Sequence, residues 1–494
     1  MGLRFLMAAL RALVGLALTL LAGPGGVLAL EAYTGAEPAD ARSTLFSVEL
    51  LATSRPTQVL RPMVYASRSP DADLGKIHRD ASGRGIFCGL HGAQFCNRSV
   101  SWVEMGSSAE DETVVVTIRS LYGPVFAQGK VSVRPESSGL SARVLAAGWA
   151  AEIRVPAGGP PRQLALEYFG SFQHAMLVFA GAPDPVLPAA QRERTLYFGP
   201  GVSHVPNNGV LQLPAGRDTI FLARGAWLDG RINITRHDQG PVRVLGHGII
   251  SGRRFTYHGG AVPDSLRTIE VQFDRPLHLS GPTLVDPKGH ALFVPPHSSV
   301  SDLKVLGWLY NEDGVWLSTN TTLSRSFVRT NDDSIRLYAG ALDGFNNLPR
   351  PPRNQPARGV VVEDVVVAQL FNGAVIQLGW EDAGIQDSIV RRVDVIGAEW
   401  YKTAGLEPND AVVSLRPPVY DVGLSEHHRN LTVEGLRVEA PVGRVVGVGL
   451  FGCATRSTLQ GLTVRDVVIR QPLRWWPAGG APPAGDNFVM AAAP

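Results

Sequence analysis

Short runs of alternating hydrophobic and polar residues follow one another along the chain, and no helical period is sustained between them. Over residues 30–188 the alternation is clear in segments such as 45–50, 114–118 and 164–168, which clusters of turn-forming residues separate. Alternation with period two is typical of strands that bury one face. The pattern therefore predicts an antiparallel β-sandwich over residues 30–188, in which 181–188 is the linker to the next part of the chain.

After this linker, short β-rich segments recur at intervals of about 20 to 25 residues, with Asn, Asp and Gly at the turns. Examples are 242–245, 303–306, 360–367 and 431–438. An irregular all-β repeat of this length indicates a solenoid, in which each coil stacks on the one before it. We therefore predict an all-β chain with an N-terminal β-sandwich, followed by a right-handed parallel β-helix over residues 189–494.

Successive coils of the predicted helix can be aligned by their side-chain alternation, which gives three columns of stacked residues. The inward column consists of Val294, Leu317, Leu337 and Leu378. The outward column beside it consists of Phe293, Trp316, Arg336 and Gln377. At the strand entry, the equivalent positions are His290, Asp313 and Asp333.

Composition narrows the class of protein. The chain has 494 residues, of which 18% are charged and 45% hydrophobic, with 54 Gly and 36 Pro, so it is ordered and rich in turns rather than disordered. A net charge of +2, with no basic stripe interleaved with aromatic residues, argues against nucleic acid as a partner. Three cysteines do not make a metal site, and we expect no metal, no cofactor and a monomer.

The N-terminus has the pattern of a secretory signal peptide. Arg4 precedes an apolar run over 13–22, and small residues near Ala29 offer a cleavage site. A membrane anchor is the alternative, but the uninterrupted run is short for a span of about 20 residues. We predict a signal peptide over 1–29, a secreted protein with no membrane contact after cleavage, and a local disulfide between Cys88 and Cys96.

Three carboxylates fall on two neighbouring coils, because Asp313 lies on one and Asp332 and Asp333 lie on the next. Like charges this close raise the pKa of at least one carboxyl group, and a raised pKa is what a general acid needs at neutral pH. Paired carboxylates hydrolyse glycosidic bonds: one protonates the leaving oxygen and another activates water. The alternative is that the acids only stabilise turns.

Other polar residues at turns have a structural explanation. Asp and Asn side chains commonly bond the local backbone where a β-helix turns. We expect this role for Asp302, Asp364, Asp387 and Asp394, and for His247 in its glycine-rich setting.

The stretch over 284–400 resembles glycoside hydrolase family 49, the dextranases and isopullulanases. The matching segments are 244–252, 307–314, 330–333 and 373–380, and the N-terminal sandwich fits the family layout. The resemblance implies an inverting, endo-acting hydrolase of α-glucan, with dextran-like α-1,6 linkages favoured. It implies that Asp332 is the general acid and that Asp313 and Asp333 position and activate water.

The sequence departs from the family pattern at three places. Arg336 stands where the family usually has Lys, Leu378 where it usually has an aromatic residue, and Asn311-Glu312 replaces a Gln-Thr type of pair. These positions could line sugar subsites, so the changes affect the expected substrate and linkage. The expected chemistry is unchanged, because all three aspartates are present. The candidate substrate-binding residues are His290, Trp316, Arg336, Gln377 and Trp380.

Two other functions stay open from the sequence. The polygalacturonases are also β-helices with an Asn-x-Asp and an Asp-Asp, but they need a Gly-His-Gly and an Arg-Ile-Lys after the acids. Here Gly246-His247-Gly248 precedes the acids and the Arg-Ile-Lys is missing, which favours a neutral glucan over a uronate. The second alternative is a carbohydrate-binding β-helix protein without catalysis.

Overall fold

The structure of the protein is a computed structural model. It describes residues 30–35, 38–68, 99–108, 112–127, 131–168, 171–234, 240–255, 267–271, 275–309, 312–338, 355–369, 373–379, 384–398, 413–416, 427–439, 448–450 and 458–469. The predicted signal peptide over 1–29, the predicted Cys88–Cys96 disulfide and Trp380 lie outside these residues.

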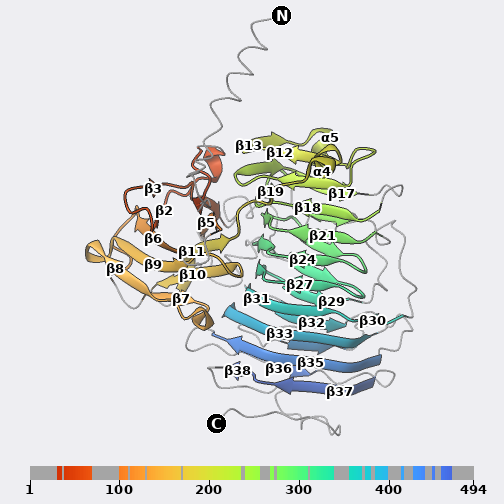
Figure 1. Cartoon of the computed structure of the whole chain (residues 1–494). Coiled ribbons are helices and arrows are strands. Elements are labelled where there is room, and N and C mark those ends of the chain that lie inside the picture. The colour runs from red at the N-terminus through yellow and green to blue at the C-terminus, as the bar shows by residue number, and fades with distance from the viewer. Residues whose placement is uncertain are drawn as a thin grey trace, which may run out of the picture.

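Two β-sheets form the N-terminal part (Figure 1). One has the order β1-β5-β11-β10-β7 with β4 paired to β5, and the other has the order β3-β2-β6-β9-β8. Their strands are β1 (Leu30–Glu31), β2 (Phe46–Ala52), β3 (Val59–Leu60), β4 (Tyr65–Arg68), β5 (Ser99–Ser107), β6 (Thr113–Ser120), β7 (Ser132–Arg134), β8 (Ala142–Leu145), β9 (Ala150–Pro156), β10 (Arg162–Tyr168) and β11 (Ser171–Gly181). Among the described residues, short 3-10 helices accompany them: η1 (Ala39–Ala41), η3 (Glu136–Ser138) and η4 (Ala146–Gly148).

The side chains between these two sheets form one hydrophobic core, so the N-terminal part is the predicted β-sandwich. One pairing differs from the antiparallel expectation, because β11 runs parallel to β5. The two strands are far apart in sequence, so no tight hairpin forces them to be antiparallel.

The rest of the chain is a parallel β-helix, in which strands from successive coils stack into long parallel ladders (Figure 1). An 18-stranded sheet is built from β12 (Thr195–Phe198), β13 (Gly201–His204), β15 (Thr219–Leu222), β16 (Ala226–Asp229), β18 (Val242–Leu245), β19 (Ile249–Ser251), β21 (Leu277–Ser280), β22 (Thr283–Val285), β24 (Ser299–Ser301), β25 (Lys304–Leu306), β27 (Thr322–Ser324), β28 (Phe327–Arg329), β30 (Ala357–Arg358), β31 (Val361–Gln369), β33 (Ile385–Ala398), β35 (His427–Val438), β37 (Thr458–Arg465) and β38 (Val468–Ile469). The predicted all-β fold class is thus confirmed.

A 9-stranded parallel sheet forms the remaining face of the helix. Its strands are β14 (Val210–Leu211), β17 (Arg231–Ile234), β20 (Ile269–Val271), β23 (Leu292–Val294), β26 (Val315–Leu317), β29 (Ile335–Leu337), β32 (Ile376–Gly379), β34 (Val413–Arg416) and β36 (Val448–Leu450). Two short helices, α4 (Ala189–Glu193) and α5 (Pro206–Gly209), lie among the first coils.

The register of this sheet confirms the columns expected from the sequence. Val294 pairs with Leu317, Leu317 with Leu337, and Leu337 with Leu378, and all four side chains belong to the buried core of the helix. The outward column also stacks as expected, because the same pairings place Phe293, Trp316, Arg336 and Gln377 one above another. Period-two alternation is sufficient here because each strand is only three or four residues long.

A left-handed backbone conformation explains most of the recurring Asp residues. Asp302, Asp364 and Asp387 have φ angles of 52°, 56° and 50°, in the left-handed region that Asp and Asn tolerate better than other side chains. Asp394 differs from the expectation. Its φ does not lie in the left-handed region, and its carboxylate accepts hydrogen bonds from Arg437 on the next coil and from Ser137 of the sandwich.

The sandwich packs against the outward side chains of one ladder of the helix. Tyr65 of β4 stacks on Trp227 of β16 with ring centroids 6.1 Å apart, and Phe179 of β11 meets Phe327 of β28 at 5.3 Å. Burial of large apolar side chains such as these contributes roughly 1.5–3 kcal/mol each. The sandwich is therefore fixed beside the coils rather than joined to them by a linker alone.

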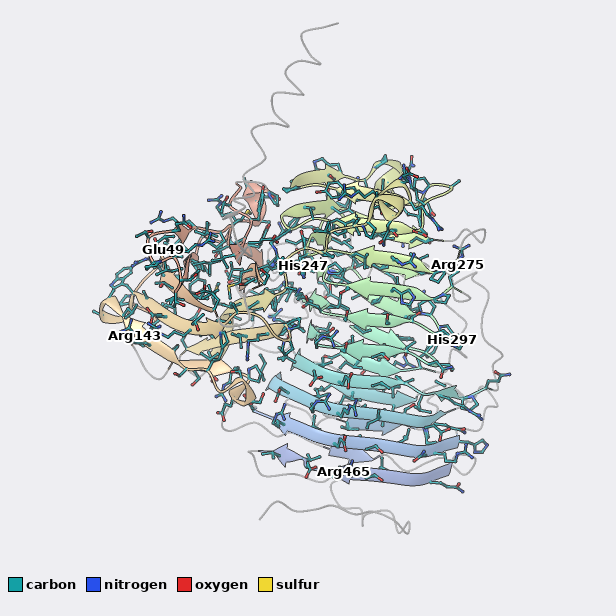
Figure 2. All side chains as sticks on the ribbon, in the orientation of Figure 1. Glu49, Arg143, His247, Arg275, His297 and Arg465 are labelled. Carbon is teal, nitrogen blue, oxygen red and sulfur yellow. The ribbon has the colours of Figure 1, made fainter. Side chains whose placement is uncertain are left out.

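His247 lies at this junction, not merely at a turn of the helix (Figure 2). Its Nδ1 is 2.6 Å from Asp184 in the segment after β11, and its Nε2 is 3.2 Å from Asp302 on a later coil. Burial alone would raise the pKa of Asp184, but the hydrogen bond with His247 and the charge of Arg224 lower this pKa to about 2.

This contact predicts a pH-dependent stability. Because the pKa of Asp184 in the folded state lies below its ordinary value of 3.8, its carboxylate stabilises the fold above that value, and the stabilisation is lost as pH falls toward about 2. We expect Asp184→Asn to lower the melting temperature most above pH about 4, with the difference from wild type vanishing near pH 2. Thermal melts across this range measure it. A difference that is the same at every pH would contradict the role of the charge.

Candidate active site

Two neighbouring coils bring the three aspartates together at the entry to β26 and β29. The backbone N–H of Ala291 donates to the carbonyl of Asp313 at 2.8 Å, and the N–H of Gly314 donates to the carbonyl of Asp333 at 2.8 Å. These two bonds place His290, Asp313 and Asp333 at equivalent positions on three successive coils. Two residues after Asp313 and Asp333, the inward side chains of Val315 and Ile335 pack in the core of the helix.

Asp332 and Asp333 differ in their surroundings although they are adjacent. Asp333 is 1% exposed, and its Oδ1 accepts a hydrogen bond from the backbone N–H of Ala374 on the following coil at 2.8 Å. Asp332 is half-buried, and its Oδ1 accepts the N–H of Asp333 at 2.9 Å. Of the pair, Asp332 is the carboxyl group with more access to a substrate.

Asp313 is buried among charges of its own sign. Burial raises its pKa well above the ordinary value, and the charges of Asp332 and Asp333 raise it further. Two groups act in the opposite direction and lower this pKa, the guanidinium of Arg336 and the Trp316 Nε1–H, which donates to Asp313 Oδ2 at 2.9 Å. A carboxyl group with a perturbed pKa beside two others is typical of an acid–base site.

His290 lies one coil before Asp313, with its Nε2 3.6 Å from Asp313 Oδ1. Its ring stacks on that of Trp316 with centroids 4.6 Å apart. Burial lowers the pKa of His290 well below its usual value, and the charges of Arg267 and Arg336 lower it further. The ring is therefore neutral at neutral pH, so it offers hydrogen-bonding nitrogens without adding a positive charge.

Aromatic and cationic side chains line the outward face beside the aspartates. Trp316 is 5% exposed, and its ring lies 4.4 Å from that of Phe293 and 5.0 Å from that of Tyr338. The guanidinium carbon of Arg336 lies 4.0 Å from the Trp316 ring centroid, and that of Arg267 lies 3.3 Å from the Phe293 ring centroid. Because Trp316 is covered and bonded to Asp313, the geometry favours a positioning role for it over stacking on a sugar.

Gln377 continues this face on the next coil. It pairs with Arg336 in the ladder, and its side chain is fully buried. Neither its amide nitrogen nor its carbonyl oxygen has a hydrogen-bond partner among the described residues. A buried amide without partners costs free energy, which is consistent with a site that a hydroxyl-rich ligand completes.

Sequence reasoning missed Arg267, Tyr338 and Glu312. Arg267 occupies the position of His290 one coil earlier, because Ile269 pairs with Leu292. Continuing the strand-entry column back by one coil would have found it, but the long segment between β19 and β20 hides the repeat in the sequence. Glu312 is fully buried, which adjacency to Asp313 alone did not indicate.

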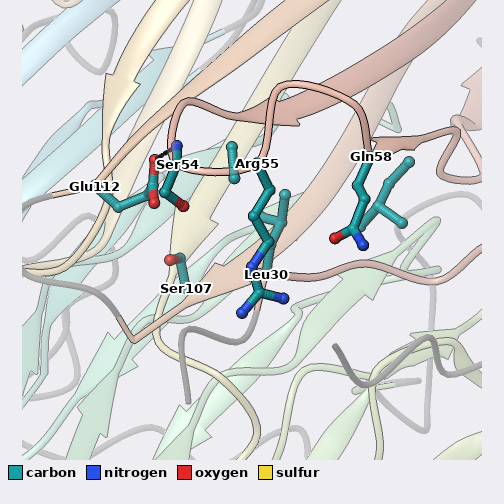
Figure 3. Close-up of a pocket in the computed structure, with 8 residues that line it drawn as sticks. Leu30, Ser54, Arg55, Gln58, Ser107 and Glu112 are labelled. Atoms are coloured by element: carbon teal, nitrogen blue, oxygen red, sulfur yellow. Dashed lines mark hydrogen bonds between the residues drawn. The ribbon is translucent and has the colours of Figure 1, made fainter. Parts of the chain in front are cut away.

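Outside the aspartate cluster, the described residues offer neither a metal site nor a second catalytic pocket. Within the described residues, no group of three His, Cys, Asp or Glu side chains is placed to hold a metal ion. A small pocket in the sandwich is lined by Leu30, Ala52, Ser54, Arg55, Gln58, Leu60, Ser107 and Glu112 (Figure 3). Its Glu112 already accepts hydrogen bonds from Thr53 and Ser54, so it has a structural function.

Comparisons with known proteins show which proteins this chain is similar to. No family model matches the sequence. The chain is 22% identical over 497 residues to a dextranase of Arthrobacter globiformis, covering 84% of this chain and 72% of that protein. It is 23% identical over 351 residues to an isopullulanase of Aspergillus niger, covering 60% of this chain and 57% of that protein. The solved structure of Dex49A from Penicillium minioluteum has the same fold, with a TM-score of 0.66 at 19% identity, covering 86% of this chain and 83% of that one.

The chain is related to the dextranases and isopullulanases of glycoside hydrolase family 49. The resemblance expected from the motifs is thus confirmed, and the relationship identifies the chain as a glycoside hydrolase with a polysaccharide substrate. The motif segments over 307–314 and 330–333, on which the resemblance rests in the sequence, are those that contain the three aspartates. Among the residues that the structure describes, no helix is long and apolar enough to cross a membrane.

Proposed function

We propose that the chain is a secreted, monomeric, endo-acting hydrolase of α-glucan that prefers dextran-like α-1,6 linkages and inverts the anomeric centre. The observation that carries this proposal is the convergence of Asp313, Asp332 and Asp333 on two neighbouring coils, beside a face lined with aromatic rings. Residues 1–29, with the pattern of a signal peptide, support secretion.

In this proposal Asp332 is the general acid. It is the most accessible of the three carboxyl groups, and it matches the general acid of the family that the sequence resembles. It donates that proton to the glycosidic oxygen as the bond to the anomeric carbon breaks.

Asp313 and Asp333 activate the water that attacks from the opposite side. Asp333 is held by the N–H of Ala374, and Asp313 by the Nε1–H of Trp316, so both carboxylates are fixed in orientation. Fixed groups of this kind reduce the entropy that must be lost to reach the transition state. Neutral His290 supplies hydrogen bonds to sugar hydroxyls, and we assign Gln377 and Trp380 to substrate binding from the sequence.

A neutral polysaccharide is the substrate in this proposal, because the arginines that the described residues place beside the aspartates are buried. The two arginines near the aspartates, Arg267 and Arg336, are each 3% exposed and lie against aromatic rings. A polyuronate would meet the three carboxylates as like charges with little to offset the repulsion.

Activity on three polysaccharides tests the function. We expect reducing sugar to be released from dextran, and from pullulan if α-1,4 linkages are also accepted, but not from polygalacturonate. Ionic strength should have little effect on the apparent affinity, since the substrate is uncharged. A higher rate on polygalacturonate than on either glucan would favour the pectin-hydrolase alternative. No turnover of any of the three, together with binding of glucan, would favour a non-catalytic carbohydrate-binding protein.

The first product from an α-linked glucan is expected to be the β-anomer. Asp313 and Asp332 lie on adjacent coils and are offset along the strand, so we expect their separation to exceed the coil rise of about 4.8 Å. Inverting enzymes need about 6.5–9.5 Å between carboxyl groups to admit water, whereas retaining enzymes need about 5–5.5 Å. Proton NMR of fresh product decides the matter, and an initial α-anomer would rule out single displacement.

A further inference from the structure

Glu312 is a fully buried carboxyl group adjacent to Asp313 that the proposed mechanism does not use. Its Oε2 accepts hydrogen bonds from the backbone N–H groups of Leu309, at 2.6 Å, and of Trp308. Gly307 leaves room for this oxygen, because a Cβ at that position would collide with it. The carboxyl group therefore closes the turn that leads from β25 to the entry of β26.

The same turn is held from the sandwich. The Trp308 Nε1–H donates to Ser67 Oγ of β4 at 2.6 Å, and Ser67 in turn donates to Asp286. Asp286 also accepts from Arg253 Nε at 2.9 Å. A continuous series of buried hydrogen bonds thus connects β4 of the sandwich with the turn that carries Asp313.

The coil that carries the other two aspartates holds the turn as well. Asn331 Nδ2 donates to the carbonyl of Trp308 at 2.9 Å, and Arg329 donates to the carbonyl of Gly307 at 2.9 Å. The Arg329 guanidinium lies 3.9 Å from the Trp308 ring centroid. Glu312 is accordingly at the centre of contacts that reach the sandwich, Asp313 and the Asp332 coil.

We propose that Glu312 is a positioning residue that sets Asp313 by clasping the backbone of Trp308 and Leu309, and that this clasp makes the sandwich part of the active-site framework. The inference rests on the proposed hydrolase function of the same site. Glu312 acts through the turn and does not itself touch the substrate.

The charge of Glu312 fits an acceptor role. Burial raises its pKa well above the ordinary value, although the N–H groups of Leu309 and Trp308 and the charge of Lys288 lower it. A neutral carboxyl group accepts both N–H bonds without adding a fourth negative charge beside the three aspartates. A glutamine side chain can make the same two bonds, whereas alanine makes neither.

Two substitutions in the full chain separate the clasp from other roles. For Glu312→Ala, we expect kcat on dextran to fall by about ten-fold or more with KM changed less than about three-fold, because Asp313 is displaced but the sugar contacts remain. Glu312→Gln should keep kcat within about three-fold of wild type, with an unchanged pH profile. Glu439→Ala is the matched control. This buried glutamate also accepts a backbone N–H, that of Glu136, but it lies at the far end of the contact between the sandwich and the helix.

Hydrogen exchange gives a readout that does not depend on turnover. We expect the Trp308 and Leu309 amides to exchange faster in Glu312→Ala than in wild type or Glu312→Gln. Unchanged exchange, or an unchanged kcat in Glu312→Ala, would overturn the proposal, as would a loss in Glu312→Gln equal to that in Glu312→Ala. If wild type hydrolyses no glucan, the proposed function fails, and the exchange rates alone decide whether the clasp exists.

Discussion

Asp332→Asn is expected to lower kcat on dextran by about 10²- to 10⁴-fold, because the amide cannot donate the proton that the leaving oxygen needs. The fold should be kept. Asp332 is half-buried, and the oxygen that accepts the Asp333 N–H at 2.9 Å has an equivalent in the asparagine side chain. Initial rates of reducing-sugar release, with a thermal melt of the same preparation, measure both parts of the expectation.

Asp387→Asn is the matched control for this substitution. Asp387 is an exposed residue of β33 with a φ of 50°, a conformation that asparagine also tolerates, and it lies on a coil beyond the site. We expect its activity to equal that of wild type. An Asp332→Asn enzyme with wild-type kcat would show that Asp332 is not the general acid, and an equal loss in both variants would point to a general effect of the substitution.

The stacking of the coils could be predicted from the sequence because the interior imposes a simple rule. Leu317 and Leu337 must point inward, so the alternation fixes Trp316 and Arg336 as outward neighbours, as the ladder confirms. The rule fails where chain segments of irregular length intervene. Arg267 occupies the same column as His290, but the preceding segment breaks the repeat, so its place could not be read from spacing.

Contacts between the sandwich and the helix could not be predicted from either part alone. The glycines beside His247 predict a turn. Its hydrogen-bond partners, Asp184 and Asp302, come from two segments that are far away in the chain. Asp394 was expected at a turn for the same reason and instead pairs with Arg437 inside the sheet. Local propensity describes a turn, whereas an ion pair across a junction depends on how two surfaces meet.

The candidate active site could also be predicted only in part from the sequence. The three aspartates could be expected together because they lie at strand entries on neighbouring coils. Their individual environments could not, since the perturbed pKa of Asp313 depends on burial and on the Trp316 Nε1–H, which a linear sequence does not orient. Packing around the aspartates therefore had to be seen before Trp316 could be assigned to positioning rather than to sugar stacking.

Gly373→Ala is expected to lower kcat by about 10²-fold, because it displaces two aspartates at once. Gly373 lies on the coil after the Asp332–Asp333 pair with a φ of 73°. A Cβ at this position would lie 2.5 Å from the backbone nitrogen of Asp333 and 2.7 Å from the carbonyl carbon of Asp332. Backbone atoms cannot rotate away as a flexible side chain would, so the pair must shift by a substantial fraction of an ångström.

Gly461→Ala separates this displacement from backbone strain. Gly461 has a similar φ of 65°, but the nearest heavy atom to an added Cβ there is the nitrogen of Asn430 at 3.6 Å. Both variants therefore carry the left-handed strain of about 1–2 kcal/mol, and only Gly373→Ala also pushes on the aspartates. We expect both melting temperatures to fall, whereas kcat falls only for Gly373→Ala. Equal kcat values in the two variants would mean that close approach of the next coil does not set the position of Asp332 and Asp333.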